Sequence, residues 1–68
     1  MSKTLDLHGK RHVEVDRLVE NFILLNRLPL TIITGNSDFM KTLVTDILNK
    51  YNMVYEQWDN AGEYKIIS

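Results

Sequence analysis

Apolar residues along this chain follow two different periods, which predicts a mixture of helices and strands. In residues 13–27 and again in residues 40–51 they recur three or four positions apart, the spacing of one helical face. The first helix is expected to bury Val15, Leu18, Val19, Phe22 and Leu25, with Ile23 and Leu24 widening that face. The second helix is expected to bury Met40, Leu43, Val44, Ile47, Leu48 and Tyr51.

Local signals set the limits of these helices. Pro29 disfavours a helical conformation at Leu28, so the first helix is expected to end just before that residue. Asn36 or Ser37 supplies the side-chain oxygen that caps the amino terminus of a helix. Asn52 tolerates the left-handed conformation in which many helices end, so the second helix is expected to stop there.

Four further segments are typical of strands. Residues 5–9 begin with alternating apolar and polar side chains, and residues 30–34 form an uncharged run rich in β-branched residues. Residues 53–59 and 63–67 flank an Asn-Ala-Gly sequence, which suits a short hairpin loop. The order strand–helix–strand–helix–strand–strand predicts a single α/β domain over residues 1–68, with two helices and a four-stranded sheet.

Composition places this domain among small proteins without disulfides. The chain has 68 residues, 44% of them apolar and none of them cysteine, which suits a small core and a cytoplasmic location. No apolar run is long enough for a signal peptide or a membrane span, so no membrane partner is expected. The net charge of −1 argues against a general polyanion binder, but the charge is uneven. Residues 1–12 carry +2 and residues 53–68 carry −2.

The first strand ends in residues with useful chemistry. Leu5 and Leu7 alternate with Asp6 and His8, so a carboxylate and an imidazole share the face opposite the leucines. Such a pair can transfer protons or hold a divalent metal ion. Gly9 allows a sharp turn or the close approach of a ligand. A simpler interpretation is that Asp6 accepts hydrogen bonds from backbone amides in a turn and that His8 is an ordinary surface residue.

A second candidate segment follows the buried strand. Thr34, Gly35, Asn36 and Ser37 lie between that strand and a helix amino terminus, where free amides and the helix dipole favour an anion. Lys41 lies about one turn into the helix and is within reach of the same place. Ordinary loop chemistry is the alternative. If the first two strands are adjacent and parallel, both segments meet at one edge of the sheet, where open α/β sheets bind their ligands.

These residues resemble the signatures of the Smr (small MutS-related) domain family. Leu5-Asp6-Leu7-His8 matches the LDxH segment of that family, and Thr-Gly-Asn-Ser at residues 34–37 is similar to its TGxG segment, with Ser37 in place of the second glycine. The resemblance covers about residues 4–52. It implies a two-layer α/β fold similar to the C-terminal domain of bacterial translation initiation factor 3, and it implies a nucleic-acid substrate.

The resemblance leads to an endonuclease as the first functional hypothesis, acting on DNA or RNA. Asp6 and His8 are then the catalytic candidates, and magnesium or manganese is a conceivable cofactor bound by these two residues. The phosphate-binding candidates are Gly9, Lys10, Arg11, Thr34, Gly35, Asn36, Ser37 and Lys41. Two alternatives stay open: a nucleic-acid-binding module that does not cleave, and a protein-interaction domain. One β-edge could also pair with a second copy of the chain or with a protein partner.

Overall fold

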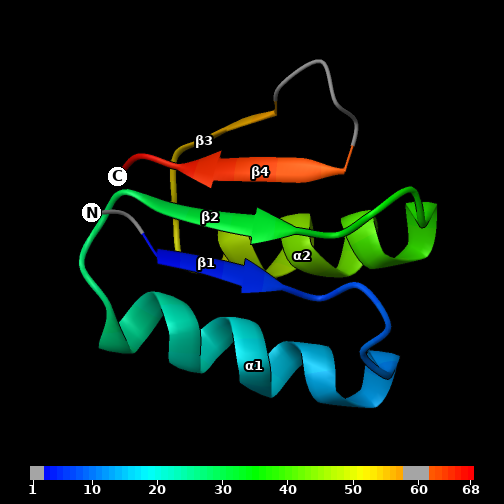
Figure 1. Ribbon diagram of the computed structural model, residues 1–68. Coiled ribbons are helices and arrows are strands. Elements are labelled where there is room, and N and C mark those ends of the chain that lie inside the picture. Colours follow the sequence, from blue (N-terminus) through cyan, green and yellow to red (C-terminus); the bar gives the residue numbers. More distant parts are fainter. Residues whose placement is uncertain (1–2, 58–61) are drawn as a thin grey trace.

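The computed structural model describes residues 3–57 and 62–68 and has the predicted order of elements (Figure 1). The helices and strands are β1 (Lys3–Asp6), α1 (His12–Leu25), β2 (Leu30–Ile33), α2 (Asp38–Lys50), β3 (Tyr55–Gln57) and β4 (Glu63–Ile66). The strands form one sheet in the order β1-β2-β4-β3. In this sheet β1 and β2 are parallel, and the other two neighbouring pairs are antiparallel. The predicted α/β class with two helices and a mixed four-stranded sheet is therefore confirmed.

Both helices cover the same face of the sheet. On that face Leu30 of β2 pairs with Ile66 of β4, and Ile32 pairs with Tyr64; all four side chains are buried. Side chains three or four positions apart on the two helices complete this core: Val15, Val19, Ile23, Met40, Val44, Ile47 and Leu48. The sequence therefore forms two layers, because each helix has a single apolar face and the sheet offers a single apolar face to match.

The opposite face of the sheet has a different composition. Successive residues of a strand point to opposite faces, so the residues next to each core residue along a strand lie on this face. One row across the sheet is formed by Thr4, Thr31, Lys65 and Glu56, and the next by Asp6, Ile33 and Glu63. These side chains are exposed or half-buried. Asp6 therefore lies on the open face, at the carboxyl end of an edge strand.

Helix α1 ends at Leu25, two residues earlier than predicted. Asn26 leaves the helix with an extended backbone, φ −128° and ψ 156°, and its side-chain amide donates a hydrogen bond of 2.8 Å to the carbonyl of Phe22. The predicted burial of Leu24 and Leu25 was wrong, because these side chains are 65% and 78% exposed. The buried side chains of α1 are four residues apart and end at Ile23. Leu25 lies about 200° around the helix axis from Ile23 and therefore points away from the core.

The strand limits differ from the prediction, while both cap predictions hold. Strand β1 begins at Lys3 and ends at Asp6, so His8 lies in the turn and not on the strand, and β4 ends one residue early. Strand β3 begins two residues late, and its predicted end, like most of the hairpin loop, lies outside the described residues. Ser37, one of the two predicted caps, accepts a hydrogen bond from the amide of Met40, and Asn52 follows α2 with a φ of 56°.

Candidate nucleic-acid interface

The Asp6-His8 turn is built by the backbone as much as by the side chains. The Asp6 carboxylate accepts a hydrogen bond of 2.9 Å from the backbone amide of His8, which ends β1 in an Asx turn. The amide of Lys10 then donates to the carbonyl of Leu7 at 2.9 Å. Gly9 between them has a φ of +80°, a conformation that glycine adopts without strain. Asp6 therefore positions the backbone of His8.

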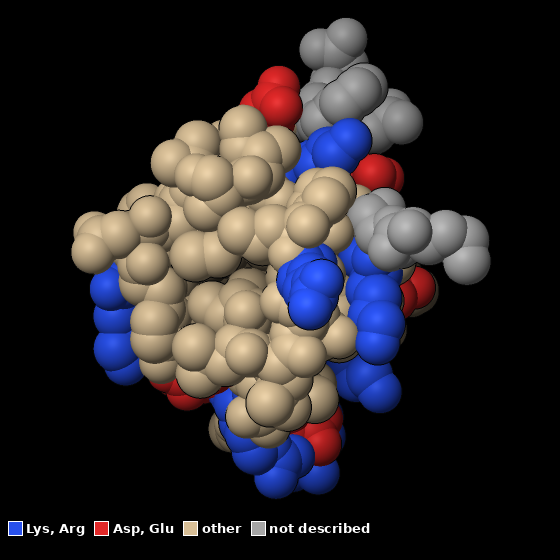
Figure 2. All heavy atoms as spheres, turned by 90° about the vertical axis from the view of Figure 1, so that its left-hand side faces the viewer, with Lys and Arg blue, Asp and Glu red and all other residues tan. Residues whose placement is uncertain are grey.

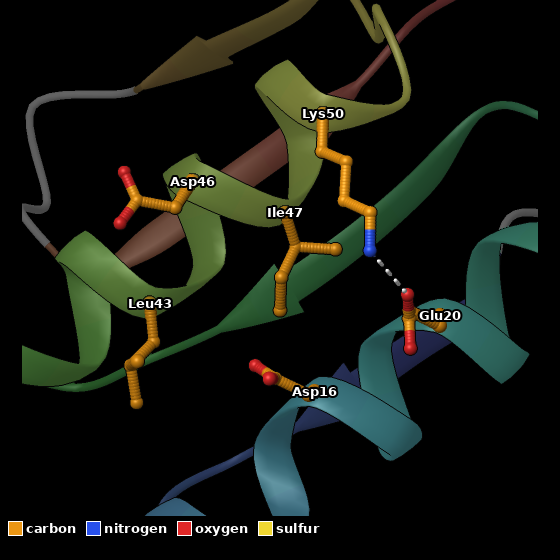
Figure 3. A pocket seen from close by; sticks show the side chains of 6 residues that line it. All are labelled: Asp16, Glu20, Leu43, Asp46, Ile47 and Lys50. Carbon is orange, nitrogen blue, oxygen red and sulfur yellow. Dashed lines mark hydrogen bonds and ion pairs between the residues drawn. The ribbon is translucent and has the colours of Figure 1, made fainter.

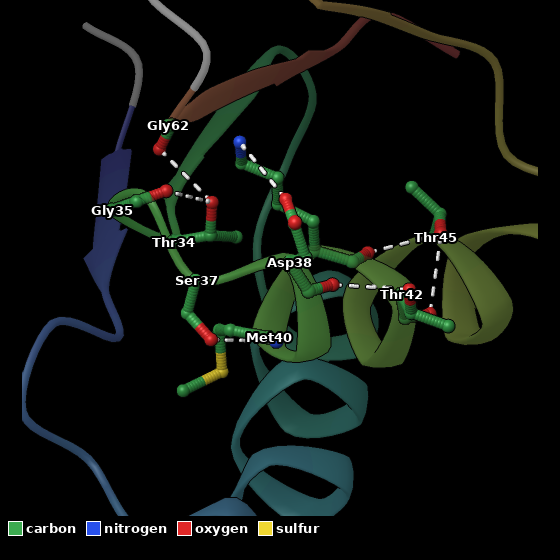
Figure 4. Close-up of polar contacts among 9 residues, drawn as sticks. Thr34, Gly35, Ser37, Asp38, Met40, Thr42, Thr45 and Gly62 are labelled. Carbon is green, nitrogen blue, oxygen red and sulfur yellow. Dashed lines mark hydrogen bonds and ion pairs between the residues drawn. The ribbon is translucent and has the colours of Figure 1, made fainter.

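The turn after β2 is fastened to the start of β4. The carbonyl of Gly62 accepts hydrogen bonds from the amide of Thr34 at 2.7 Å and from the amide of Gly35 at 3.3 Å. The Thr34 hydroxyl, buried with the rest of its side chain, lies 3.0 Å from the carbonyl oxygen of Gly35 and 3.2 Å from that of Gly62, and donates between them (Figure 4). These three donors, which the sequence suggested for phosphate binding, are already used within the protein. Thr34 and Gly35 therefore shape the turn.

Gly62 is a structural residue that the sequence analysis did not single out. A Cβ atom added there would lie 2.8 Å from the carbonyl oxygen of Gly35 and 3.0 Å from its Cα. Real Cβ contacts of that length essentially never occur, and the obstructing atoms are backbone that cannot rotate away. The glycine is thus required by the close approach of two backbone segments. Its place directly before β4 was the one sequence signal for this role.

The two predicted segments meet at the carboxyl ends of β1 and β2. These strands are parallel and adjacent, with Asp6 opposite Ile33. A Cβ atom built on Gly35 would lie 3.6 Å from Cδ2 of His8, so the imidazole lies directly beside the Gly35 backbone. The expected convergence of the two segments is confirmed. The His8 side chain is exposed, and its ring nitrogens bond to none of the residues that the structure describes.

Donors for an anion are available just beyond this contact. The amides of Asn36 and Ser37 donate to no residue in the described ranges, and both residues are exposed. The Ser37 oxygen accepts the amide of Met40 at 3.2 Å, which leaves its hydroxyl hydrogen available to a ligand. Lys41 is less available than expected, because its ammonium group lies 3.9 Å from the Asp38 carboxylate and its side chain is only 18% exposed.

Two cations extend this edge beyond the first turn. Lys10 and Arg11 are exposed and form no ion pair with a residue of the described ranges. Arg11 occupies the N-cap of α1, where its backbone amide donates to the Glu14 carboxylate at 3.3 Å. Because that bond uses only the backbone of Arg11, its guanidinium group can meet a phosphate. The name "polar edge" is used below for residues 6–11 together with residues 34–37.

A groove elsewhere on the molecule has the wrong charge for a nucleic acid. A groove of about 250 Å³ runs between α1 and α2, and it is lined by Asp16, Glu20, Leu43, Asp46, Ile47 and Lys50 (Figure 3). Three carboxylates face one ammonium group there, so phosphate would be repelled. The polar edge is an exposed rim, which fits a long polymer better than a small enclosed molecule.

One hydrogen-bonded cluster in that groove has a clear structural role. The hydroxyl of Tyr51 donates to the Glu20 carboxylate at 2.5 Å, and the Lys50 ammonium lies 3.5 Å from the same oxygen. The hydrogen bond from Tyr51 lowers the pKa of Glu20, assisted by the charge of Lys50 and opposed by burial. The same bond raises the pKa of Tyr51. The cluster links α1 to the end of α2.

The residues of the polar edge do not form a metal-binding cage. Asp6 and His8 are two potential ligands, and nowhere in residues 3–57 or 62–68 do three His, Cys, Asp or Glu side chains gather closely enough to hold an ion. One oxygen of Asp6 is also occupied by the amide of His8. A magnesium or manganese ion would therefore find no preformed protein site among these residues.

Comparison with known proteins identifies no relative of this chain. No family model, no curated protein and no solved structure matches this chain. The class of the protein is thus defined by its own structure: a two-layer α/β domain with an exposed Asp-His turn at the carboxyl ends of two parallel strands. None of the described helices is long and apolar enough to cross a membrane.

Proposed function

We propose that this protein is a cytoplasmic, Smr-like domain that binds nucleic acid along its polar edge and cleaves a phosphodiester bond there. The observation that carries the proposal is the position of His8. Its imidazole, which bonds to none of the described residues, lies beside the Gly35 backbone, next to the Asn36 and Ser37 amides that likewise have no acceptor among them. A group that can move protons and a set of anion-binding donors therefore occupy one rim, which is where a ligand of an open α/β sheet is expected.

Each component has a definite role in this proposal. Cleavage requires a proton to be removed from the attacking oxygen and another to be given to the leaving oxygen, and His8 is the side chain suited to such transfers near neutral pH. The amides of Asn36 and Ser37 stabilise the negative charge that develops on the phosphoryl oxygens. Lys10 and Arg11 hold a neighbouring phosphate. Asp6 is a positioning residue, because its carboxylate fixes the backbone of His8.

A second candidate is a domain that binds nucleic acid without cleaving it. One observation favours it: the Asp6 carboxylate bonds to a backbone amide and not to the imidazole, so nothing among the described residues orients the His8 ring through a hydrogen bond. A pure binding role would need the same rim but no proton transfer. A third possibility, a protein-interaction domain, has no comparable observation on this rim.

Two variants of Asp6 separate these roles in a cleavage assay on end-labelled single-stranded, duplex and branched oligonucleotides, with and without Mg²⁺ or Mn²⁺. Asp6→Asn keeps an oxygen that can accept the amide of His8, whereas Asp6→Ala removes it. If Asp6 acts by positioning, Asp6→Asn retains most of the cleavage and Asp6→Ala loses it. Equal loss in both variants would assign a role to the negative charge. Binding without cleavage of any substrate by the wild type would favour the second candidate.

A further inference from the structure

An exposed pair of aromatic rings adjoins the polar edge and has no role in the core. Phe39 lies in the first turn of α2, two residues after the Ser37 cap, and His12 is the first residue of α1. Their ring centroids are 4.5 Å apart with an interplanar angle of 68°, an edge-to-face contact. This contact joins the amino-terminal ends of the two helices on the side of the molecule that carries the polar edge.

Phe39 differs from the other aromatic side chains that the structure describes. It is 56% exposed, whereas the remaining rings are buried or half-buried: Phe22, Tyr51, Tyr55 and Tyr64. The buried face of α2 passes through Met40, Val44, Ile47 and Leu48, and Phe39 lies beside that face and not on it. Folding therefore does not require a large apolar ring at this position. Val13, 82% exposed beside His12, adds to the apolar surface there.

The charges around this pair indicate what would cover it. His12 directly follows Lys10 and Arg11, two exposed cations that pair with no described residue, and Phe39 follows the turn before α2, whose Asn36 and Ser37 amides donate to none of the described residues. The two carboxylates nearest in sequence both have partners: Asp38 lies 3.9 Å from the Lys41 ammonium group, and Glu14 accepts the backbone amide of Arg11 at 3.3 Å. An occupant with a flat apolar surface next to a negative charge matches this arrangement, and an unpaired nucleotide has both.

We propose that Phe39 and His12 form a stacking platform for an unpaired base, so that the polar edge recognises single-stranded nucleic acid and not intact duplex. This inference rests on the proposed function and names its substrate class. In a duplex the base faces are covered by neighbouring base pairs, whereas in a single strand, a loop or a frayed end they are open to an aromatic ring. A base held on Phe39 keeps the adjoining phosphate near Asn36 and Ser37.

The test measures binding by fluorescence anisotropy at low salt with three probes of equal length: a single strand, its duplex, and an abasic strand that keeps the phosphates. Base stacking on an aromatic side chain predicts that Phe39→Ala weakens single-strand binding about tenfold. Phe39→Trp should retain binding, because any aromatic face can stack. The abasic strand should bind weakly and equally to the wild type and to Phe39→Ala. Leu25→Ala, which truncates a side chain 78% exposed at the other end of α1, is the matched control.

Each outcome supports or overturns the proposal. Phe39 is exposed, so its truncation leaves the core unchanged, and a circular dichroism spectrum checks the fold. Unchanged single-strand binding by Phe39→Ala, or equal wild-type affinity for the abasic strand, would overturn the stacking platform while the proposed function survives. Failure of every probe to bind would overturn both. If this surface binds a protein and not a base, none of the three probes should bind, and both proposals are overturned.

Discussion

The two ends of this molecule differ in what they expose. At the carboxyl ends of β1 and β2 the surface combines a carboxylate, an imidazole, two cations and amides that donate to no described residue, with the exposed side chains of Phe39 and Val13 beside them. At the opposite end, which Figure 2 faces, a broad uncharged surface is exposed, with Lys and Arg mostly at its margin. Five exposed apolar side chains belong to segments at that end: Leu24, Leu25, Leu28, Val54 and Ile67.

The difference teaches where function should be sought. Both ends consist of loops and helix termini, so exposure alone does not distinguish them. Of the two ends, as far as the structure describes them, the polar edge is the one that combines amide donors, cations and an imidazole, and the hydrogen bonds of Asp6 and Gly62 hold the backbone turns that carry them. The apolar end offers large exposed side chains, and the Asn26 side-chain amide there already donates to the carbonyl of Phe22. This end therefore supplies control variants that alter an exposed surface without touching the proposed chemistry.

The largest expected effect is the loss of cleavage on substitution of His8. His8→Gln removes the group that moves protons, and general acid–base catalysis contributes about 10²- to 10⁴-fold to a rate. We expect a loss of at least about 100-fold in the cleavage rate, measured under single-turnover conditions, with nucleic-acid binding retained. Leu25→Ala at the apolar end should cleave at the wild-type rate. Full activity in His8→Gln would show that His8 does not transfer protons in the cleavage reaction.

The next effect concerns the stability of the polar edge. Gly62→Ala forces a methyl group against the Gly35 backbone, and overpacking of this kind costs about 2 kcal/mol of unfolding free energy. Gly9→Ala is the comparison, because a Cβ there meets no atom within 4 Å and only the positive φ is strained, at about 1 kcal/mol. Urea denaturation measures both. A smaller loss for Gly62→Ala than for Gly9→Ala would contradict the close approach.

A smaller effect is expected for the cations of the polar edge. Lys10→Ala combined with Arg11→Ala removes two phosphate contacts, which should reduce the steepness of the salt dependence of single-strand binding by about 1.4 in log–log slope. Anisotropy titrations from low to moderate salt give this slope. Arg27→Ala, an exposed cation that follows α1 at its other end, should leave it unchanged. Equal slopes in the double variant and the wild type would show that the two cations do not contact phosphate.

The smallest effect lies away from both ends, at the Glu20–Tyr51 hydrogen bond. The bond lowers the pKa of Glu20 below its usual value of 4.5, so its stabilisation is present above that pH and is lost as the pH falls through the lowered value. It raises the pKa of Tyr51 above 10.0, so the same stabilisation disappears as the pH rises through the raised value. Tyr51→Phe should therefore be less stable than the wild type between these limits and approach it outside them. A constant difference at all pH values would contradict this linkage.

Much of the fold could be predicted because short-range patterns determine it. The apolar spacing of Val15, Val19 and Ile23 and the cap at Ser37 are local signals, and the structure follows them. The failures have physical causes as well. Leu25 is as apolar as a core residue, but it lies beyond Ile23, the last buried residue of α1, and its side chain points away from the core. The Asx turn at Asp6 ends β1. The sequence allowed Asp6 to be either a catalytic residue or an acceptor for backbone amides, and only the position of its side chain shows that it accepts the amide of His8.

The candidate site was predictable in location but not in detail. Parallel strands bring their carboxyl ends together, so the meeting of His8 with Gly35 followed from topology. The amides of Thr34 and Gly35 donate to the carbonyl of Gly62, which is 27 or more residues away in the chain, and no local sequence pattern predicts such a contact. The sequence analysis left Phe39 out of the buried face of the second helix, but nothing in the sequence indicated that its ring contacts His12. The similarity to translation initiation factor 3 and the membership of the Smr family stay predictions.

The most direct test of the central claim is an NMR titration of ¹⁵N-labelled protein with a short single-stranded oligonucleotide at low salt. The account predicts that amide shifts cluster in residues 6–12 and 34–41, around the polar edge and the aromatic pair. It also predicts that the apolar end, residues 24–28 with 54 and 67, stays unperturbed. Shifts confined to the apolar end, or no shifts with DNA or RNA of any form, would contradict it.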